Sequence, residues 1–503
     1  MSNKKFIKYF IIVSFLIISF IPILNFIILG NEIKKENIYT LDNFEAYRNY
    51  IIYKKFNYSM NQAQVIAGKD DFLFLGNNYD NVLHKTNGIY KPTNEEINNW
   101  TNKLKDLQKW YEERGINFVI VIAPNKHSIY KEKLPNWMQY DGKTITDNIV
   151  EQSNLKDINI LDLRNIISNN KKDKLLYFKT DTHWNNLGAS IAYSETINYI
   201  NNKFNLNLQK PNYTIKDQFR PSGDLSSFLK INTILDEKYE NSYILNFENN
   251  QEVCHGNIIK NNGILEKCNN KLNPIMGINA QPQYIINKNI KDNKKLLLLC
   301  DSFGTATSEL YNLTFNTIWK WHYGQINGEK LSNFVEENKP DLVIYQIVER
   351  ALYNDSIVTS IPNISQISID NINLENQIFD IKQNNYFKNE QLELDFKNEN
   401  YNLNAINSDP IIILNETKAN SKNVILSYEI NSNVDTTFQL FYKKENNSNY
   451  NEADSYKVPL KIGNNKINLL IPSEYINNDL RVDLVSSVGN YEIKEFKIFD
   501  YRR

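Results

Sequence analysis

Three polar residues at element boundaries have the types and spacing needed for nucleophilic catalysis. Ser302 follows the apolar run 296–300, and a serine at a strand-to-helix turn can expose its hydroxyl and offer its own N–H to an oxyanion. His183 could serve as the base, because Asp181 can accept the Nδ1 proton and leave Nε2 free to react. The chain therefore contains a candidate nucleophile, base and orienting carboxylate.

Each member of this set also has a structural interpretation. Ser302 alone is a common turn or helix-cap residue, and Asp181 with His183 is equally a helix cap with a hydrogen-bonded neighbour. The remaining histidines have no comparable neighbours; they are His84, His127, His255 and His322. Spacing alone leaves both interpretations open.

Composition excludes several classes of protein. The 503 residues carry 57 Lys and Arg against 58 Asp and Glu, a net charge of -1 that argues against nucleic acid as the main partner. A hydrophobic content of 41% is enough for large cores, so wholesale disorder is excluded. The three cysteines form no C-x-x-C spacing, and we expect neither a metal site nor a cofactor.

The N-terminus indicates the compartment. Lysines 4, 5 and 8 precede an apolar run from Tyr9 to Leu29, and about 20 helical residues cross a ~30 Å hydrocarbon core. Because no A-x-A-like cleavage site follows, residues 1–30 are typical of an uncleaved signal anchor rather than a signal peptide. The positive flank places the tail in the cytoplasm, so we expect a single-pass cell-membrane protein with an extracytoplasmic body.

The cysteines fit an exported body. Cys254 and Cys268 lie in a polar stretch that is expected to be a loop, and an oxidising exterior would allow a disulfide between them. The sequence leaves their pairing open. Cys300 ends an apolar run and is expected to be a buried strand thiol.

Short apolar runs alternating with helical patterns predict an α/β domain over residues 62–360 with a mostly parallel sheet and flanking helices. The predicted strands are Phe118–Ala123, Leu296–Cys300, Leu342–Ile347 and, more weakly, Ile158–Leu163. One predicted helix begins after Thr93, where Glu96 completes a capping box, and another spans about 186–204.

Residues 376–503 have a different pattern. Their apolar segments are short, often alternate with polar residues, and are separated by Asn and Asp turns roughly every ten residues, which predicts a β-sandwich. The segments include Ile411–Leu414, Val424–Ile430, Thr436–Tyr442 and Lys466–Ile471. Residues 31–61 are expected to form a stalk and residues 361–375 a linker.

Six ordered blocks resemble the alginate O-acetyltransferase (AlgX/AlgJ-type) family of SGNH-hydrolase-like proteins. The blocks are Ala67–Leu75, Ala123–Lys126 with Tyr130 and Leu134–Pro135, Asp181–Asn185, Gly223–Leu225, Asp301–Phe303, and Pro340–Val343 with Glu349–Arg350. Asp71 departs from the pattern, because the family usually has glycine there. The departure falls in a turn, and little effect on chemistry is expected.

The resemblance implies an SGNH-hydrolase-like parallel sheet and a serine acyl-enzyme mechanism. Ser302, deprotonated by His183, would take an acetyl group and pass it to a hydroxyl of an exopolysaccharide or cell-wall glycan. It also implies a membrane-bound O-acyltransferase partner as acetyl supplier. Candidate substrate or oxyanion contacts are Lys126, Tyr323 and Arg350, for which a surface role is an equal alternative.

The C-terminal segment is similar to jelly-roll carbohydrate-binding modules that accompany exported polysaccharide enzymes. This resemblance implies polymer binding through aromatic faces, although Phe438 and Tyr442 are equally expected as core residues. Two other functions remain open. The same triad with water as acceptor would make a carbohydrate esterase, and a chain without turnover would be a membrane-tethered glycan-binding scaffold.

Overall fold

The computed structural model of the chain describes residues 3–30, 33–171, 174–236, 238–247, 253–258, 265–269, 282–326, 328–358, 364–367, 369, 374, 376–396, 401–414, 417–443 and 449–501. Two compact units make up the chain. The first comprises Met1–Gln325 and Pro340–Val358, and the second comprises Ile326–Lys339 and Thr359–Arg503.

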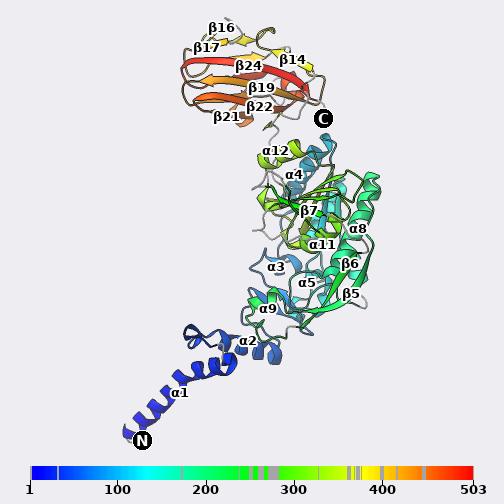
Figure 1. Cartoon of the computed structure of the whole chain (residues 1–503), viewed down its shortest axis with the longest axis vertical. Helices are drawn as coiled ribbons and strands as arrows, with labels where there is room; N and C mark the ends of the chain where they lie inside the picture. The colour runs from blue at the N-terminus through cyan, green and yellow to red at the C-terminus, as the bar shows by residue number, and fades with distance from the viewer. Residues whose placement is uncertain are drawn as a thin grey trace. The chain divides into compact units, whose positions relative to one another are not determined.

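The chain begins with a long apolar helix, α1 (Asn3–Leu29), the dark blue helix at the N-terminus in Figure 1. Its residues Lys4–Leu29 are long and apolar enough to cross a membrane, as an anchor or a signal sequence would be. The predicted stalk contains a short 3-10 turn, η2 (Lys35–Asn37), and a second helix, α2 (Asp42–Phe56). Figure 1 places α2 between α1 and the α/β part of the first unit.

The first unit is built on an eight-stranded sheet of order β4-β3-β12-β10-β11-β9-β7-β8. The strands from β4 to β11 are parallel, and β9, β7 and β8 extend the sheet with antiparallel pairing. Their bounds are β3 (Asn117–Ala123), β4 (Ile160–Asp162), β7 (Val253–Asn257), β8 (Leu265–Asn269), β9 (Gln283–Asn287), β10 (Lys295–Cys300), β11 (Thr317–His322) and β12 (Leu342–Val348). The predicted mixed, mostly parallel α/β fold is confirmed.

Capping residues define the two longest helices of the α/β part of this unit. Thr93 and Glu96 exchange side-chain and backbone hydrogen bonds at the start of α4 (Asn94–Glu113), as the capping box predicts. Asn185 caps α8 (Asn186–Phe204) by accepting from the N–H of Gly188. Shorter helices of this unit are α3 (Val82–Thr86), α5 (Lys126–Ile129), α6 (Ile145–Leu155), α7 (Arg164–Asn170), α9 (Asp224–Phe228) and α11 (Gly304–Asn312).

Small elements complete the first unit. Two antiparallel ribbons pair β1 (Val65–Ala67) with β2 (Leu73–Leu75), and β5 (Tyr213–Arg220) with β6 (Glu240–Phe247). Four single turns of 3-10 helix are η3 (Lys131–Lys133), η4 (Asn136–Met138), η5 (Tyr323–Gln325) and η6 (Glu349–Ala351). Asp71, which follows β1, adopts a left-handed φ of 65°, a conformation that accounts for the family's glycine there.

The stretch around Cys254 is strand rather than the predicted loop. β7 and β8 pair in a register that places Cys254 opposite Cys268. Cys254 is disulfide-bonded, whereas Cys300 is a buried free thiol. Polar residues can occupy these strands because they lie at one end of the sheet, where a strand needs less apolar cover.

The second unit is a β-sandwich, drawn in yellow to red in Figure 1. One sheet has the order β13-β22-β19-β24-β17-β16 with β14 beside β24, and the other has the order β15-β18-β23-β20-β21. Their bounds are β13 (Ser365–Gln366), β14 (Asn376–Asp380), β15 (Phe387–Lys388), β16 (Leu392–Asp395), β17 (Tyr401–Ala405), β18 (Ile411–Leu414), β19 (Asn423–Ser432), β20 (Thr436–Phe441), β21 (Ser455–Leu460), β22 (Gly463–Pro472), β23 (Leu480–Asp483) and β24 (Gly489–Tyr501).

Three details of the second unit differ from the sequence expectations. The predicted linker contributes β13, which pairs with β22, although much of 361–375 lies outside the described residues. Helix α12 (Gly328–Asn338), from the crossover between β11 and β12, groups with the sandwich. Short turns of helix also occur within the strand region, at α13 (Ser473–Asn477) and η7 (Glu452–Asp454).

Candidate active site

Ser302 lies at the carboxyl end of β10, the edge at which ligands bind in parallel α/β sheets. The preceding carboxylate of Asp301 fixes the turn: Oδ1 accepts from the N–H of Phe303 (2.9 Å) and Oδ2 from the N–H of Val348 (2.7 Å). Helix α11 then starts at Gly304, where a Cβ would overlap with Cys300. The nucleophile turn is thus held to both β10 and β12.

A loop between Tyr177 and Asn185 carries the other two predicted residues. It has no strand of its own beyond a single bridge between Tyr177 and Trp184. The indole Nε1 of Trp184 donates to the carbonyl of Phe303 (3.1 Å), which joins this loop to the nucleophile turn. The His183 and Phe303 rings also pack, with centroids 5.0 Å apart.

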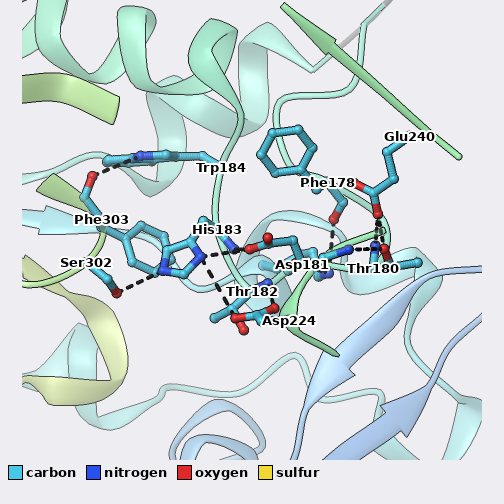
Figure 2. A network of polar contacts seen from close by, with 12 residues as sticks. Phe178, Thr180, Asp181, Thr182, His183, Trp184, Asp224, Glu240, Ser302 and Phe303 are labelled. Carbon is cyan, nitrogen blue, oxygen red and sulfur yellow. Dashed lines mark hydrogen bonds and ion pairs between the residues drawn. The ribbon is translucent and has the colours of Figure 1, made fainter. Parts of the chain in front are cut away.

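The structure brings Asp181, His183 and Ser302 together in one hydrogen-bonded chain (Figure 2). Asp181 Oδ1 lies 2.7 Å from His183 Nδ1, and His183 Nε2 lies 2.8 Å from Ser302 Oγ. An ionised Asp181 can only accept, so the neutral ring carries its proton on Nδ1 and turns the Nε2 lone pair to the serine. This is the geometry in which a histidine can take the serine proton.

Arg220 and His183 keep Asp181 ionised. Burial disfavours the charge, but hydrogen bonds and charge from His183, with the charge of Arg220, hold the pKa of the Asp181 carboxyl below its usual range. Arg220 Nη2 donates to Asp181 Oδ2 at 2.9 Å, and its guanidinium lies 4.1 Å from the centroid of the Phe178 ring. Arg220 therefore occupies the carboxylate oxygen that the histidine does not use.

A second carboxylate, Asp224, also lies near the histidine, as Figure 2 shows. Its Oδ2 is 4.0 Å from His183 Nδ1, and its Oδ1 accepts from the N–H of Thr182 (2.7 Å). Burial, together with the charge of Asp181, raises the pKa of Asp224. A Cβ on the preceding Gly223 would overlap with the Asp181 side chain, so glycine is required for this close approach.

Asp181, His183 and Asp224 are also spaced as metal ligands could be, with potential ligand atoms within 4.8 Å of one another. One pair of these atoms is already joined by the hydrogen bond between Asp181 Oδ1 and His183 Nδ1. A cation bound to Nδ1 would need this ring proton to leave, which would change the tautomer that the triad requires.

Lys126 supports the loop between Tyr177 and Asn185, called here the histidine loop, through its buried side chain. Its ammonium is buried and donates to the carbonyls of Phe178 (3.1 Å), Lys179 (3.0 Å) and Asp181 (2.7 Å). Burial lowers the pKa of Lys126 to about 8, although nearby carboxylates favour the charged form. With all three protons so directed, Lys126 is placed to hold the loop rather than to make the predicted contact with substrate.

Glu240 at the start of β6 holds the same loop from the side. It accepts from both the N–H and the hydroxyl of Thr180. Burial raises the pKa of Glu240. The β5–β6 ribbon thus contributes Arg220 from one strand and Glu240 from the other, which are paired across the ribbon.

The other two predicted contacts lie in the short turns that follow β11 and β12, the strands on either side of β10. Tyr323 is buried directly after β11, and burial with the charges of Asp301 and Asp80 raises its pKa. The guanidinium of Arg350 follows β12 and lies 5.8 Å from the Phe303 ring centroid. Among the described residues, no hydrogen-bond acceptor contacts its buried Nε; Asp80 Oδ2 is 3.7 Å away.

Sequence reasoning missed Arg220 and Glu240 and gave Asp224 no role. All three are long-range partners of one loop, and nothing in the local sequence of Arg220 or Glu240 indicates that contact. Gly223–Asp224 was the available signal, because a glycine before a carboxylate in a turn can allow a close backbone approach.

Fold and geometry together define an α/β domain with a candidate serine, histidine and aspartate triad at the carboxyl edge of its sheet, and comparison with known proteins adds a family resemblance. Residues 65–253 match the family model described as ALGX, SGNH hydrolase-like domain, acetyltransferase AlgX. Through this segment the chain is similar to the AlgX/AlgJ type of SGNH-hydrolase-like acetyltransferases. The resemblance predicted from the sequence is confirmed over these residues.

One curated relative is the probable alginate O-acetylase AlgJ of Pseudomonas aeruginosa, 23% identical over 177 residues. The match covers 34% of this chain and 43% of AlgJ, so the chain spans less than half of that relative. Among solved structures, Bacillus cereus PatB1 has a TM-score of 0.45 at 18% identity, covering 58% of this chain and 98% of PatB1. Pseudomonas aeruginosa AlgX has a TM-score of 0.37 at 13% identity, covering 91% of this chain and 98% of AlgX.

Proposed function

We propose that this chain is a membrane-anchored, extracytoplasmic O-acetyltransferase that acetylates hydroxyl groups of a polysaccharide through an acetyl-Ser302 intermediate. The observation that carries the proposal is the unbroken hydrogen-bonded chain from Asp181 through His183 to Ser302. The family match supports acetyl transfer as the reaction.

In the first half-reaction, Ser302 Oγ attacks the carbonyl carbon of an acetyl donor while its proton passes to His183 Nε2. The C–O bond to the donor breaks, the leaving group takes that proton from Nε2, and the acetyl group stays on Ser302. In the second half-reaction a sugar hydroxyl attacks the acetyl carbon and gives its proton to Nε2. The proton then returns to Ser302 Oγ as the ester to the enzyme breaks.

Asp181 and Asp224 would stabilise the imidazolium that forms in both half-reactions. Asp181 accepts the Nδ1 proton directly, and Asp224 adds a second carboxylate at 4.0 Å. Asp224 lies on the Nδ1 side of the ring, away from the Nε2 side that the attacking hydroxyl must approach. It therefore acts on the histidine rather than on the acceptor.

The oxyanion needs donors that the turn has not already used. The N–H of Phe303 is engaged by Asp301, which leaves the N–H of Ser302 itself as the backbone candidate. Arg350 is the candidate second donor, because its guanidinium lies 5.8 Å from the Phe303 ring centroid and its buried Nε has no hydrogen-bond acceptor among the described residues, with Asp80 Oδ2 3.7 Å away. We propose that Arg350 donates a hydrogen bond to the oxyanion or to the adjacent substrate oxygen. Tyr323 is proposed to line the neighbouring wall of the same pocket.

The anchoring of the catalytic unit is supported by contacts between α1 and the chain that follows it. Asn25, near the end of α1, is fully buried and bonds to residues 37–43. A helix packed in this way is part of the folded protein, which favours an anchor over a removed signal peptide. A membrane-bound O-acyltransferase would then be within reach as the acetyl supplier.

Polymer binding is assigned to the outer face of the β15–β21 sheet of the sandwich. Phe438, one of the expected aromatic candidates, is fully buried, and Tyr442 stacks on Tyr475 with centroids 4.1 Å apart. The outer face instead carries Arg481, whose guanidinium lies 4.6 Å from the Phe441 ring centroid. Arg481 on β23 pairs with Ile413 on β18, and Ile413 pairs with Phe387 on β15. Phe387 therefore lies in register with Arg481, and its side chain is 55% exposed.

The test uses the full chain in detergent with an activated acetyl ester, with and without candidate oligosaccharides, and mass spectrometry of the sugar products. Acetylated sugar formed by the wild type and not by Ser302→Ala would support the transferase. Release of acetate alone, dependent on Ser302, would identify an esterase. Failure of a serine-directed phosphonate to label Ser302, with glycan binding intact, would identify the scaffold.

A further inference from the structure

Outside α1, exposed large apolar side chains are concentrated in one short part of the chain. Seven of them lie between residues 39 and 60, against twelve over all described residues from 61 to 501. We define the juxtamembrane face as four of the seven: Tyr39, Leu41, Tyr47 and Ile51, which are 69%, 53%, 41% and 47% exposed. A patch of this kind marks an interaction site more often than chance exposure does.

The juxtamembrane face begins beside the end of α1 because Asn25 folds the chain back. The Asn25 amide donates to the carbonyls of residues 37, 38 and 40 at 2.9, 3.0 and 2.9 Å, and its Oδ1 accepts from Asn43 Nδ2 (3.1 Å). The Phe20 and Phe44 rings pack edge to face, with centroids 5.9 Å apart. Residues 37–44 therefore run along the last turns of α1 instead of leading away from it.

The length of α1 places these residues at the level of a membrane interface. Its apolar part, Tyr9–Leu29, spans about 32 Å, close to the thickness of a hydrocarbon core, and the rest of its length is the lysine-bearing turn at the cytoplasmic end. The end of α1 therefore lies at the outer edge of the core, and Tyr39 and Leu41 lie beside it. Tyrosine is enriched at this depth because its ring is apolar and its hydroxyl is polar.

The opposite side of α2 holds the catalytic unit. Ala46, Asn49 and Tyr53 form its buried stripe, and Tyr47 and Ile51 lie one turn apart on the other side. Asn49 Nδ2 donates to the carbonyl of Leu229 (2.9 Å), the C-cap of α9.

Two further contacts fix this packing. Tyr53 Oη donates to the carbonyl of Asp71 (3.0 Å), and Glu45 pairs with Lys230 at 2.5 Å. Helix α9 starts at Asp224, so a single short helix separates the α2 contact from the histidine site.

We propose that α2 and the turn before it lie on the outer surface of the lipid bilayer, with Tyr39, Leu41, Tyr47 and Ile51 among the headgroups. The bilayer is the occupant because the face is continuous with α1 and is fastened to it by Asn25. One side of α2 would rest on the membrane while the other side packs against α9. This arrangement would hold the Asp181–His183–Ser302 site at a fixed, short height above the membrane. This inference depends on the proposed anchoring by α1.

The test measures the depth of single labels on the full chain in vesicles of phosphatidylglycerol and phosphatidylcholine. Tyr47→Cys and Ile51→Cys would each be labelled with the environment-sensitive dye NBD. Because Cys254 is disulfide-bonded and Cys300 is buried, the dye reacts with the introduced cysteine. Leu155→Cys, at a 73% exposed apolar position of the catalytic unit, is the matched control.

We expect blue-shifted emission at positions 47 and 51, quenched severalfold by nitroxide-labelled lipid, and water-like emission at position 155. Equal emission at all three positions in protein that floats with carbonate-washed vesicles would overturn the docking while leaving the anchor intact. Protein that fails to float would overturn the anchor and the docking together. Labels shielded in native membranes but not in pure lipid would replace the bilayer with a membrane protein as the occupant.

Turnover of a soluble acetyl ester gives an independent readout. Tyr47→Ser with Ile51→Ser should leave this turnover unchanged, because neither residue is near Ser302. Loss of soluble turnover in this variant would mean that the face stabilises the catalytic unit, and would count against docking.

Discussion

The catalytic edge of the first unit and the outer sheet face of the second place polar side chains in opposite ways. At the catalytic edge, Asp181 and His183 lie on an irregular loop, which buried Lys126 and Glu240 hold in place. On the sandwich face, strand alternation turns Arg481 of β23 and Phe387 of β15 outward, in one register across β23, β18 and β15. The first arrangement fixes atoms for a reaction, and the second displays a surface.

This difference predicts different sensitivities to mutation. A loop held by several buried charges should lose its geometry when any one of them changes, because each loses a desolvated partner. Side chains displayed by regular strands can be replaced singly without moving the backbone.

The largest effect is expected at the catalytic edge itself. Ser302→Ala and His183→Ala should each lower acetyl turnover at least about a thousandfold, and the double variant should be no worse, because the two residues act as a unit. Steady-state turnover of an activated acetyl ester measures this, with circular dichroism as the control for folding. Turnover by Ser302→Ala at the wild-type level would contradict the mechanism.

Asp181→Asn should cost about 100- to 10,000-fold in turnover, because an amide can present its NH₂ to Nδ1 and reverse the tautomer. The matched variant is Asp224→Asn, whose carboxylate lies 4.0 Å from Nδ1 and should matter about tenfold. Both are measured as kcat on the same ester. Equal losses in the two variants would show that the carboxylates are interchangeable, contrary to the assigned roles.

Lys126 should make the stability of the protein depend on pH. With its pKa lowered to about 8 in the folded state and near 10.4 when unfolded, the unfolded chain binds more protons between these values. The free energy of unfolding should therefore rise by about 3 kcal/mol from pH 8 to pH 10.4 through this group, and not change through it below pH 8.

Urea unfolding of wild type and Lys126→Met over pH 7–10.5 would isolate that contribution. The variant should lack the rise, and exposed Lys203→Met serves as the control for removing a lysine. Parallel stability curves for wild type and Lys126→Met would contradict the burial-lowered pKa.

The smallest effect is expected on the sandwich face. Phe387→Ala should weaken binding of the acceptor polymer severalfold and leave turnover of a small ester unchanged, because a ring 55% exposed on a regular strand can be removed without repacking. Ile462→Ala, 69% exposed in the same unit, is the matched control. Equal polymer affinity in the two variants would move the binding surface elsewhere.

The parts of the fold that follow from local pattern were predictable. The four apolar runs became β3, β4, β10 and β12, and Thr93 and Asn186 marked helix starts, because burial and capping are encoded within a few residues. The polar strands β7 and β8 were expected as loop. They pair at one end of the sheet, where the apolar signal of a buried strand is weak.

The candidate site likewise contains residues that the local sequence could predict and residues that it could not. Ser302, His183 and Asp181 could be nominated because each follows or precedes a recognisable element and matches a family block. The contact of Arg220 with Asp181, and that of Glu240 with Thr180, join the histidine loop to the β5–β6 ribbon over 39 and 60 positions of sequence. Lys126 was expected to face substrate, since its burial beneath the loop depends on the fold and not on its neighbours in sequence.

The strand order of the first unit also has a consequence for the biogenesis of an exported chain. β12 is the last strand of the parallel part to be synthesised, yet it pairs with β3 on one side and β10 on the other. It also supplies the Val348 N–H that holds Asp301 beside the nucleophile. If the chain is exported as proposed, the residues after α1 cross the membrane in chain order, and the body would therefore remain without a closed sheet or an assembled triad until Val348 had crossed.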